Sequence, residues 1–319
     1  MNKQKITYFI GILLMHCMVF SAIAAPIQDR CTQQCHLTVM LDWFINPDHA
    51  PLFIAEQQGY FKRYGLDVTF IPPADPTDTV KLVAAQKADI GITYEPQFLR
   101  QQQSQTLPLV PIGTLIEGPL DCFIVLKTSA IHSIADLKGK RIGYSSANTG
   151  GAILKTVLAQ AGLSESDVTL VNVHYNLTQA LLSKKVDMIT GAMRNFEPYE
   201  FQLVRQPIRV FYPEENGLPY YDELIFITHT KNSNDPRIQL FLKAVQAGAV
   251  YLKNHPHSSW LLFAKNHPEL HNPINEKAWF ATMPRFTLRP QLVDESQYDS
   301  FKKILLKPRS SSDTLVQKR

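Results

Sequence analysis

Three familiar enzyme signatures are missing from the 319-residue chain. There is no Gly-x-Ser-x-Gly nucleophile elbow, no His-Glu-x-x-His zinc motif and no Walker phosphate loop. The common sequence patterns of serine hydrolases, zinc peptidases and P-loop nucleotidases are therefore excluded.

A marked excess of one charge sign is also missing. Lys and Arg number 32 against 28 Asp and Glu, a net charge of +4, and two of the lysines lie in a segment that we expect to be removed. No basic stripe with interleaved aromatic residues stands out, which argues against a nucleic-acid-binding protein. With 45% hydrophobic residues the composition indicates a globular protein that handles a small molecule. At about 100 to 200 residues per domain, the length predicts two domains.

Long apolar runs are limited to one, near the N-terminus. A short basic start precedes an apolar stretch at residues 6–20, and Ala22-Ile23-Ala24 has the small-x-small pattern of a cleavage site. We expect residues 1–24 to be a signal peptide cleaved near Ala24, and the mature protein to be exported to the periplasm. An uncleaved anchor is the alternative, although the run is shorter than the roughly 20 residues that span a bilayer.

Cysteine is scarce, with four in the chain. In an oxidising compartment Cys31 and Cys35 would form a small disulfide. The alternatives are a metal site that adds His36, for which no fourth ligand stands nearby, and two free thiols. Cys122 lies in an apolar run, where an inert core cysteine is the expectation. We therefore predict no bound metal and no cofactor.

Strands and helices alternate in the predicted secondary structure, twice over. The first unit has strands at residues 37–41, 68–71 and 90–92, with helices at 50–64 and 79–85. The second unit has strands at 141–144, 168–173 and 188–190, with helices at 152–161 and 179–183. This order predicts an α/β fold with mostly parallel sheets.

A short internal repeat supports the two units. Lys87-Ala88-Asp89-Ile90 and Lys185-Val186-Asp187-Met188 each open a strand, and the strands lead into Tyr94-Glu95-Pro96 and Phe196-Glu197-Pro198. Because ligands sit at the carboxyl ends of parallel strands, two facing units would present both glutamates to one cleft. Chance similarity is the alternative for so short a pattern.

The chain after Asp222 is predicted to return to the first unit. Residues 223–230 have the pattern of a strand, and residues 236–254 have that of an amphipathic helix. Pro119 and Pro219 lie near the two crossings, where we expect a hinge. We therefore expect lobe 1 to combine residues 37–118 and 223–319, and lobe 2 to be the inserted residues 119–222.

Two loops concentrate groups that suit ligand binding. The first holds Trp43, Asn46 and His49, which offer a ring, an amide and an imidazole to a flat heterocycle. The alternative is structural, with Asp48 capping a helix and His49 satisfied in the core. The second loop precedes a helix N-terminus, where N–H groups attract anions or carbonyl oxygens, although helix capping explains part of its composition. Its candidate residues are Ser145, Asn148 and Thr149.

The two triplets and the second crossing supply the other candidates. These are Tyr94, Glu95, Asn195, Glu197, Tyr221 and Asp222. Paired carboxylates are typical of glycosidases, but nothing in the sequence fixes their separation. A carboxylate facing an aminopyrimidine is equally good chemistry, because it accepts from the exocyclic amine and from a protonated ring nitrogen.

An ordered series of motifs resembles one known family. The motifs include Leu41-Asp42-Trp43-Phe44, Gly59-Tyr60-Phe61-Lys62, Pro73-Ala74-Asp75-Pro76, Lys87-Ala88-Asp89-Ile90-Gly91 and Asp136-Leu137-Lys138-Gly139-Lys140. Together they resemble the family that joins bacterial pyrimidine-precursor-binding proteins to the fungal thiamine pyrimidine synthase, over about residues 37–262. The resemblance implies a type II periplasmic-binding-protein fold, in which two α/β lobes close on a ligand in the cleft between them.

The resemblance also implies which of the two family activities applies. The fungal enzyme builds the pyrimidine from pyridoxal phosphate and its own histidine, with a lysine holding the pyridoxal phosphate and a Cys-Cys-Cys-Phe-Cys run nearby. Here Thr93 stands where the lysine would fall, Gln97 stands where the histidine would fall, and residues 218–222 contain no cysteine. These departures would remove the synthase chemistry.

We therefore expect a periplasmic receptor that delivers a thiamine-type pyrimidine, such as formylaminopyrimidine or hydroxymethylpyrimidine, to the permease of an ABC importer. Trp43 and a tyrosine would stack on the small heterocyclic ligand, and Glu197 or Glu95 would take its amine edge. Two alternatives stay open: a synthase-like protein that still uses pyridoxal phosphate, and a receptor for another solute such as an alkanesulfonate.

Overall fold

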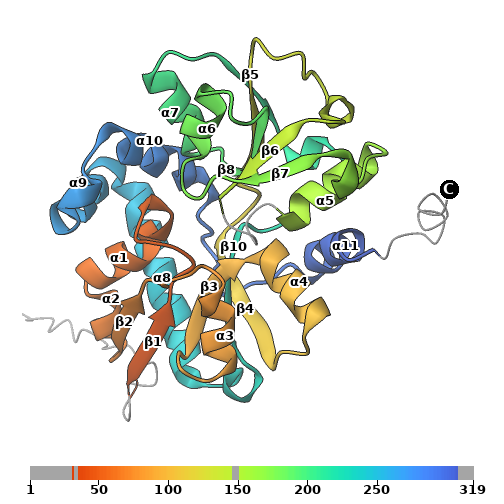
Figure 1. Cartoon of the computed structure of the whole chain (residues 1–319). Helices are drawn as coiled ribbons and strands as arrows, with labels where there is room; N and C mark the ends of the chain where they lie inside the picture. The colour runs from red at the N-terminus through yellow and green to blue at the C-terminus, as the bar shows by residue number, and fades with distance from the viewer. Residues whose placement is uncertain (1–30, 32–34, 146–150, 308–319) are drawn as a thin grey trace, which may run out of the picture.

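The computed structural model describes Cys31, residues 35–145 and residues 151–307 (Figure 1). The expected signal peptide, residues 1–24, lies outside the described residues, and so do the site candidates Asn148 and Thr149. Within the described ranges, none of the helices combines the length and the apolar character that crossing a bilayer requires.

The described strands form two five-stranded sheets, each at the centre of one lobe (Figure 1). The sheet of lobe 1 has the order β2-β1-β3-β10-β4, and that of lobe 2 the order β7-β6-β8-β5-β9. Lobe 1 contains β1 (His36–Met40), β2 (Asp67–Ile71), β3 (Ile90–Tyr94), β4 (Leu109–Ile116) and β10 (Leu224–His229). Lobe 2 contains β5 (Asp121–Leu126), β6 (Arg141–Tyr144), β7 (Thr169–Asn172), β8 (Met188–Met193) and β9 (Ile208–Phe211).

The α/β class is confirmed, but both sheets are mixed rather than mostly parallel. β1 pairs in parallel with β2 and β3, whereas β10 runs antiparallel between β3 and β4. In lobe 2, β5 likewise runs antiparallel between β8 and β9. The antiparallel strands follow the two crossings, so each enters its sheet from the end at which the parallel strands finish.

Helices surround both sheets. Lobe 1 has α1 (Ala50–Gln57), α2 (Tyr60–Arg63), α3 (Asp78–Ala84), α4 (Glu95–Ser104), α8 (Pro236–Asn254), α9 (Pro256–Asn266) and α10 (Pro273–Thr282). Lobe 2 has α5 (Gly151–Gln160), α6 (Leu177–Leu182) and α7 (Glu197–Leu203), and the chain ends with α11 (Glu295–Leu305). The single helix expected over residues 50–64 is two helices, because Gly59 takes a left-handed φ of 71° between them.

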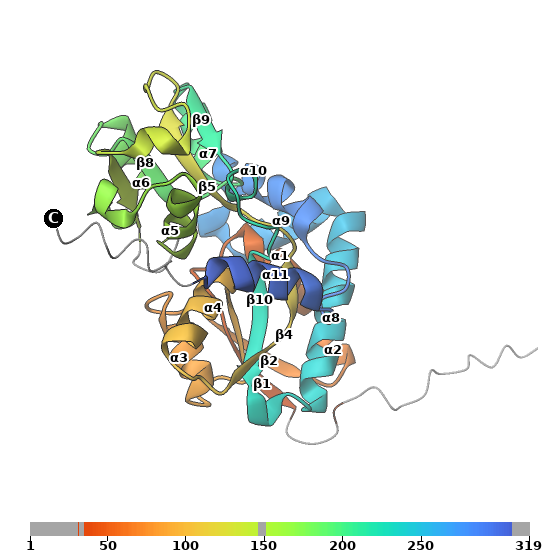
Figure 2. The same ribbon diagram turned by 90° about the vertical axis from the view of Figure 1, so that its right-hand side faces the viewer.

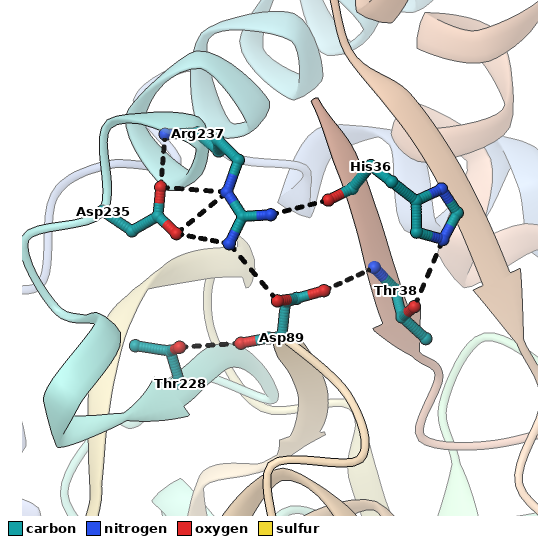
Figure 3. A network of polar contacts seen from close by, with 6 residues as sticks. All are labelled: His36, Thr38, Asp89, Thr228, Asp235 and Arg237. Atoms are coloured by element: carbon teal, nitrogen blue, oxygen red, sulfur yellow. Dashed lines mark hydrogen bonds and ion pairs between the residues drawn. The ribbon is translucent and has the colours of Figure 1, made fainter. Parts of the chain in front are cut away.

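The repeated Lys-x-Asp motif has the same structural role in both lobes. Asp89 Oδ2 accepts a hydrogen bond from the Thr38 N–H at 2.8 Å, and the Asp89 N–H donates to the Thr38 carbonyl at 2.9 Å. Asp187 makes the same two bonds with Arg141, at 2.9 and 2.8 Å. In lobe 1, Arg237 at the start of α8 adds an ion pair to Asp89 (Figure 3). The motif therefore joins neighbouring parallel strands at their beginnings, at the opposite ends from the site candidates.

The last helix departs from the expected return to lobe 1. α11 packs against α4 of lobe 1 and α5 of lobe 2, and it lies between the lobes in Figure 2. Its Phe301 ring stacks on Tyr221 with 4.5 Å between ring centroids, and both rings belong to a core cluster with lobe 2 residues such as Phe123 and Leu158. α11 therefore bridges the two lobes.

The N-terminal cysteines are bonded to each other. Cys31 and Cys35 form a disulfide with 5.7 Å between their Cα atoms, and the Cys31 N–H donates to the Tyr64 carbonyl at 3.0 Å. His36 Nδ1 lies 2.9 Å from Asp67 Oδ2. The described residues contain no group of three or more His, Cys, Asp or Glu side chains that could hold a metal ion.

The packing of α8 on α1 generates a test of the fold. A Cβ atom on Gly248 would lie 2.3 Å from the Pro51 carbonyl oxygen and 2.8 Å from the Ala55 Cβ. Gly248→Ala should therefore lower the free energy of unfolding by about 1–3 kcal/mol, more than the helix-propensity gain of at most about 1 kcal/mol. The change in the free energy of unfolding is measured by urea denaturation. Gly151→Ala, with no neighbouring atom within 4 Å, is the control, and equal stability of the two variants would contradict this packing.

Candidate functional site

A cavity of about 470 Å³ lies between the two lobes. Lobe 1 lines it with Trp43, Phe44, Asn46, Asp48 and Tyr94. Lobe 2 lines it chiefly with Ser145, Tyr175, Met193, Phe196, Glu197 and Glu200. These residues end or follow the parallel strands β1, β3, β6, β7 and β8, at the sheet edges where α/β proteins place their ligands.

Five of the residues expected from the sequence meet in this cavity. They are Trp43, Asn46, Tyr94, Ser145 and Glu197. Their contact with a ligand stays a prediction. Phe44, Asp48, Tyr175 and Glu200 line the same cavity but were not among the predicted ligand contacts. Tyr175 lies three residues after the end of β7, so the rule that ligands lie at the carboxyl ends of strands was the signal that would have found it.

Three aromatic rings from both lobes meet at the cavity. The Trp43 and Tyr175 centroids are 5.5 Å apart, those of Trp43 and Phe44 are 5.9 Å apart, and those of Phe44 and Tyr175 are 6.5 Å apart, all edge to face. Phe44 is 55% exposed and Tyr175 is 62% exposed. Because a contiguous cluster of exposed aromatic side chains is uncommon on the surface of a monomer, these rings fit a binding role better than a role in the core.

His49 is a core residue rather than a cavity residue. It is fully buried, with Nε2 2.9 Å from Asp42 Oδ1, and its Nδ1 accepts from the Asn46 N–H at 3.3 Å. The accepting Nδ1 assigns the ring proton to Nε2, so the neutral imidazole donates to Asp42. This is the structural alternative stated for His49, and it fixes the turn that carries Asn46 and Asp48.

The two triplet glutamates do not face one cleft, which corrects the expectation from the repeat. Glu95 Oε2 accepts from the Asp222 N–H at 2.7 Å, so this carboxyl binds the second crossing instead of lining the cavity. Burial raises the pKa of Glu95 to about 8. Asp222 itself accepts from Thr114 and Gln297, at 2.7 and 3.2 Å.

The spacing along the chain explains why the glutamates differ. α4 begins directly after β3, whereas a three-residue turn, Arg194 to Phe196, separates β8 from α7. Glu95 therefore begins its helix beside the crossing, and Glu197 is carried on into the cavity. The sequence held this signal, because Glu197 follows its repeat lysine, Lys185, at a greater distance than Glu95 follows Lys87.

Two more predicted contacts lie away from this cavity. Tyr221 is fully buried against Phe301. Asp222 lines a second cavity, of about 800 Å³, between the crossings and the segment around Arg285 and Arg289. We assign the functional site to the smaller cavity because it joins rings and carboxyls of both lobes at the carboxyl ends of their strands.

Asn195 is also absent from the cavity lining, but it holds a residue that lines it. Its Nδ2 donates to Asp48 Oδ1 at 2.7 Å, and Thr282 Oγ1 at the end of α10 lies 2.8 Å from the same oxygen. Asn195 belongs to lobe 2, so this contact joins the lobes at the site. Burial raises the pKa of Asp48 to about 7, opposed by the bond from Thr282.

The carboxyl of Glu197 is held by the backbone before its helix. Glu197 Oε2 accepts from the Met193 N–H at 2.7 Å. Burial raises its pKa to about 8, which the Met193 bond opposes and the nearby charges of Glu200 and Asp48 reinforce. A carboxyl with this pKa exchanges a proton near neutral pH, so it can donate or accept a hydrogen bond toward a ligand.

Comparison with known proteins agrees with the motifs. The chain is 43% identical over 263 residues to a Haemophilus influenzae protein named for thiamine biosynthesis, covering 82% of this chain and 83% of that one. It is 29% identical to the formylaminopyrimidine-binding protein of Halalkalibacterium halodurans, over 74% of this chain and 72% of that one. It is 28% identical to the 4-amino-5-hydroxymethyl-2-methylpyrimidine phosphate synthase of Legionella pneumophila, over 79% of this chain and 80% of that one.

The fold itself is that of periplasmic binding proteins. The alkanesulfonate-binding protein SsuA of Xanthomonas axonopodis superposes with a TM-score of 0.66 at 18% identity, over 88% of this chain and 96% of that one. A family model described as NMT1/THI5 like matches residues 46–259, which include most of lobe 1 and all of lobe 2. The chain therefore belongs to the NMT1/THI5-like family.

Proposed function

We propose that this chain is an exported solute-binding protein that captures a thiamine-type pyrimidine, such as formylaminopyrimidine or hydroxymethylpyrimidine, for the permease of an ABC importer. The observation that carries the proposal is a carboxyl, Glu197, set among aromatic rings in a cavity between two lobes. The relatives named for thiamine biosynthesis and for formylaminopyrimidine binding support the ligand class.

The chemistry of the cavity suits a flat ring with an amine edge. Trp43 and Tyr94 offer aromatic rings, and Glu197 offers both carboxyl oxygens, one of which also accepts from the Met193 N–H. An aminopyrimidine places an exocyclic amine beside a ring nitrogen, so one carboxyl group can bind both atoms. The volume of about 470 Å³ lies within the usual range for small-molecule sites.

An alkanesulfonate fits this cavity poorly. A sulfonate is permanently anionic, and the described lining contributes Asp48, Glu197 and Glu200 but no lysine or arginine. Anions in proteins are generally paired with Arg, Lys or clustered N–H donors. The likeness to the alkanesulfonate-binding protein concerns the fold and is no argument for a shared ligand.

Synthase chemistry also lacks its residues at the expected positions. Thr93 is 1% exposed within β3, and Gln97 is 3% exposed within α4. Neither lines the cavity, and neither can form a Schiff base. A binding function is therefore the better proposal, although a phosphate synthase stands among the relatives.

Closure would take place about the two crossings. Glu223 Oε2 accepts from the Leu120 and Asp121 N–H groups, at 2.5 and 3.0 Å, so the second crossing is bonded to the first. Pro119 and Pro219 lie in these segments and limit their backbone freedom. Under this proposal the lobes rotate about the bonded pair, and the permease binds the closed form.

The first test is direct binding. Titration calorimetry should detect hydroxymethylpyrimidine or formylaminopyrimidine with micromolar or better affinity, and alkanesulfonates should give no heat. Glu197→Ala should weaken binding at least tenfold, because it removes a charged or strong hydrogen bond worth about 1.5–3 kcal/mol. Glu276→Ala, on the exposed face of α10, is the control. No binding of either pyrimidine would refute the ligand class.

The second test is the pH dependence of affinity. The carboxyl of Glu197 and the pyrimidine ring share one proton in the complex, and Glu197 carries that proton below its pKa of about 8. Above about pH 8 the proton must come from solution, so the affinity of wild type should fall by up to about tenfold per pH unit. Glu197→Gln keeps one donor and one acceptor without titrating, so its affinity should be nearly constant. A flat wild-type profile from pH 7 to 9.5 would exclude this pairing.

The third test separates a receptor from a synthase. Purified protein incubated with pyridoxal phosphate should show no Schiff-base absorbance, because Thr93 occupies the position expected of the lysine. The variant Thr93→Lys serves as the positive comparison. A Schiff-base band in the wild-type protein that is lost on borohydride treatment would overturn the assignment.

A further inference from the structure

Two carboxyl groups beside Glu197 are not used by the pairing described above. Asp48 comes from lobe 1, and Glu200 lies one helical turn after Glu197 on α7. Both line the cavity, and both are close enough to Glu197 that their charges raise its pKa. The site therefore brings three carboxyls together although one would serve an aminopyrimidine edge.

Each of these two carboxyls has one oxygen bonded to protein and one left over. Asp48 Oδ1 is bonded to Asn195 and Thr282, and Glu200 Oε2 accepts from Thr178 Oγ1 at 2.5 Å. Among the described residues the second oxygen of each has no hydrogen-bond partner and is not fully enclosed by protein. Asp48 lines the cavity and is only 8% exposed, so its free oxygen is an acceptor in a largely buried site.

The rest of the lining favours positive charge as well. Trp43, Phe44, Tyr94, Tyr175 and Phe196 present aromatic rings to the cavity, and the faces of such rings attract cations. No lysine or arginine is among the described lining residues. A buried carboxylate without a partner costs free energy, and a cationic ligand group would remove that cost by pairing with it.

We propose that Asp48 and Glu200 make the cavity selective for ligands that carry a positive charge beside the pyrimidine ring, and make it reject anionic esters of the same ring. This inference rests on the proposed function, since Glu197 is assigned to the ring itself. A ligand with a protonated amine on its side chain gains a charged hydrogen bond, whereas a phosphate ester meets the carboxyls of Asp48 and Glu200 in a site of low dielectric constant.

The two residues have separate parts in this selectivity. Asp48 is fixed by a bond from Thr282 of α10 in its own lobe and by a bond from Asn195 of lobe 2, and the second bond forms only when the lobes are together. Glu200 belongs wholly to lobe 2, where Thr178 on α6 orients it. Asp48 would therefore couple charge recognition to closure, and Glu200 would act in either state.

The experiment compares three ligands that differ only in one side chain. The pyrimidine ring of hydroxymethylpyrimidine is used with an aminomethyl group, with the hydroxymethyl group and with its phosphate ester, and each dissociation constant is measured by calorimetry at pH 7. The aminomethyl cation should bind at least tenfold more tightly than the neutral alcohol. The phosphate ester should bind at least a hundredfold more weakly than the cation.

Variants assign the effect to the two carboxyls. Glu200→Gln and Asp48→Asn should each reduce the ratio of cation to phosphate affinity at least tenfold. Glu276→Gln, which changes an exposed acid on α10, should leave the ratio unchanged. If Asp48→Asn lowers the melting temperature, Glu200→Gln, which leaves the contact between the lobes intact, decides the question.

The outcomes separate this inference from the function on which it rests. Equal affinities for the three ligands, or tighter binding of the phosphate ester, would overturn the charge selectivity and leave the pyrimidine receptor standing. Ratios that survive in both variants would also overturn it, because the selectivity would then have another source. Failure of all three ligands and of formylaminopyrimidine to bind would refute the proposed function and the selectivity together.

Discussion

The bond between the two crossings is the constraint on which the rest of the molecule depends. Glu223 is 2% exposed, and its carboxyl accepts from two successive N–H groups of the first crossing, those of Leu120 and Asp121. A buried carboxyl without such donors would cost several kcal/mol. The pair of bonds therefore fixes where β5 enters lobe 2 and where β10 enters lobe 1. It thereby also fixes how the two sheets face each other.

Further polar groups secure the same junction from both sides. Glu95 binds the second crossing through the Asp222 N–H, and the Arg194 N–H donates to the Leu120 carbonyl at 2.8 Å. Arg194 also pairs with Glu214 at 2.7 Å. Backbone N–H groups bind the buried carboxyls of Glu95 and Glu223 here, so rigidity at the junction comes from hydrogen bonds to the main chain.

Local patterns in the sequence predicted local structure well. Most strands and helices fall within a few residues of their expected bounds, because each follows from apolar periodicity and from Gly or Pro at its ends. The helix break at Gly59 and the antiparallel entry of β5 and β10 were missed. The helix break depends on the left-handed conformation of one residue, Gly59. The direction of β5 and β10 depends on how the chain passes from one lobe to the other, which periodicity does not encode.

The predicted site residues likewise divide into those that local patterns place correctly and those that they do not. Residues that end or follow a strand, such as Trp43, Tyr94 and Ser145, reach the cavity because sheet topology alone puts them there. Tyr221 and Glu95 had suitable chemistry but meet partners distant in sequence, Phe301 and Asp222, that no local pattern reveals. Whether His49 faces a ligand or lies in the core depends on one hydrogen bond, the one to Asp42.

The charge of the whole chain says little about the charge that a ligand meets. The chain carries a net +4, yet the described cavity lining includes three carboxyls and no lysine or arginine. Salt screens exposed charges over about 8–10 Å, whereas charges in a cleft walled by protein interact in a medium of lower effective dielectric constant. A weakly basic surface is thus compatible with a site that attracts cations. Selectivity in such a protein is set by the few groups that lose water when the lobes meet.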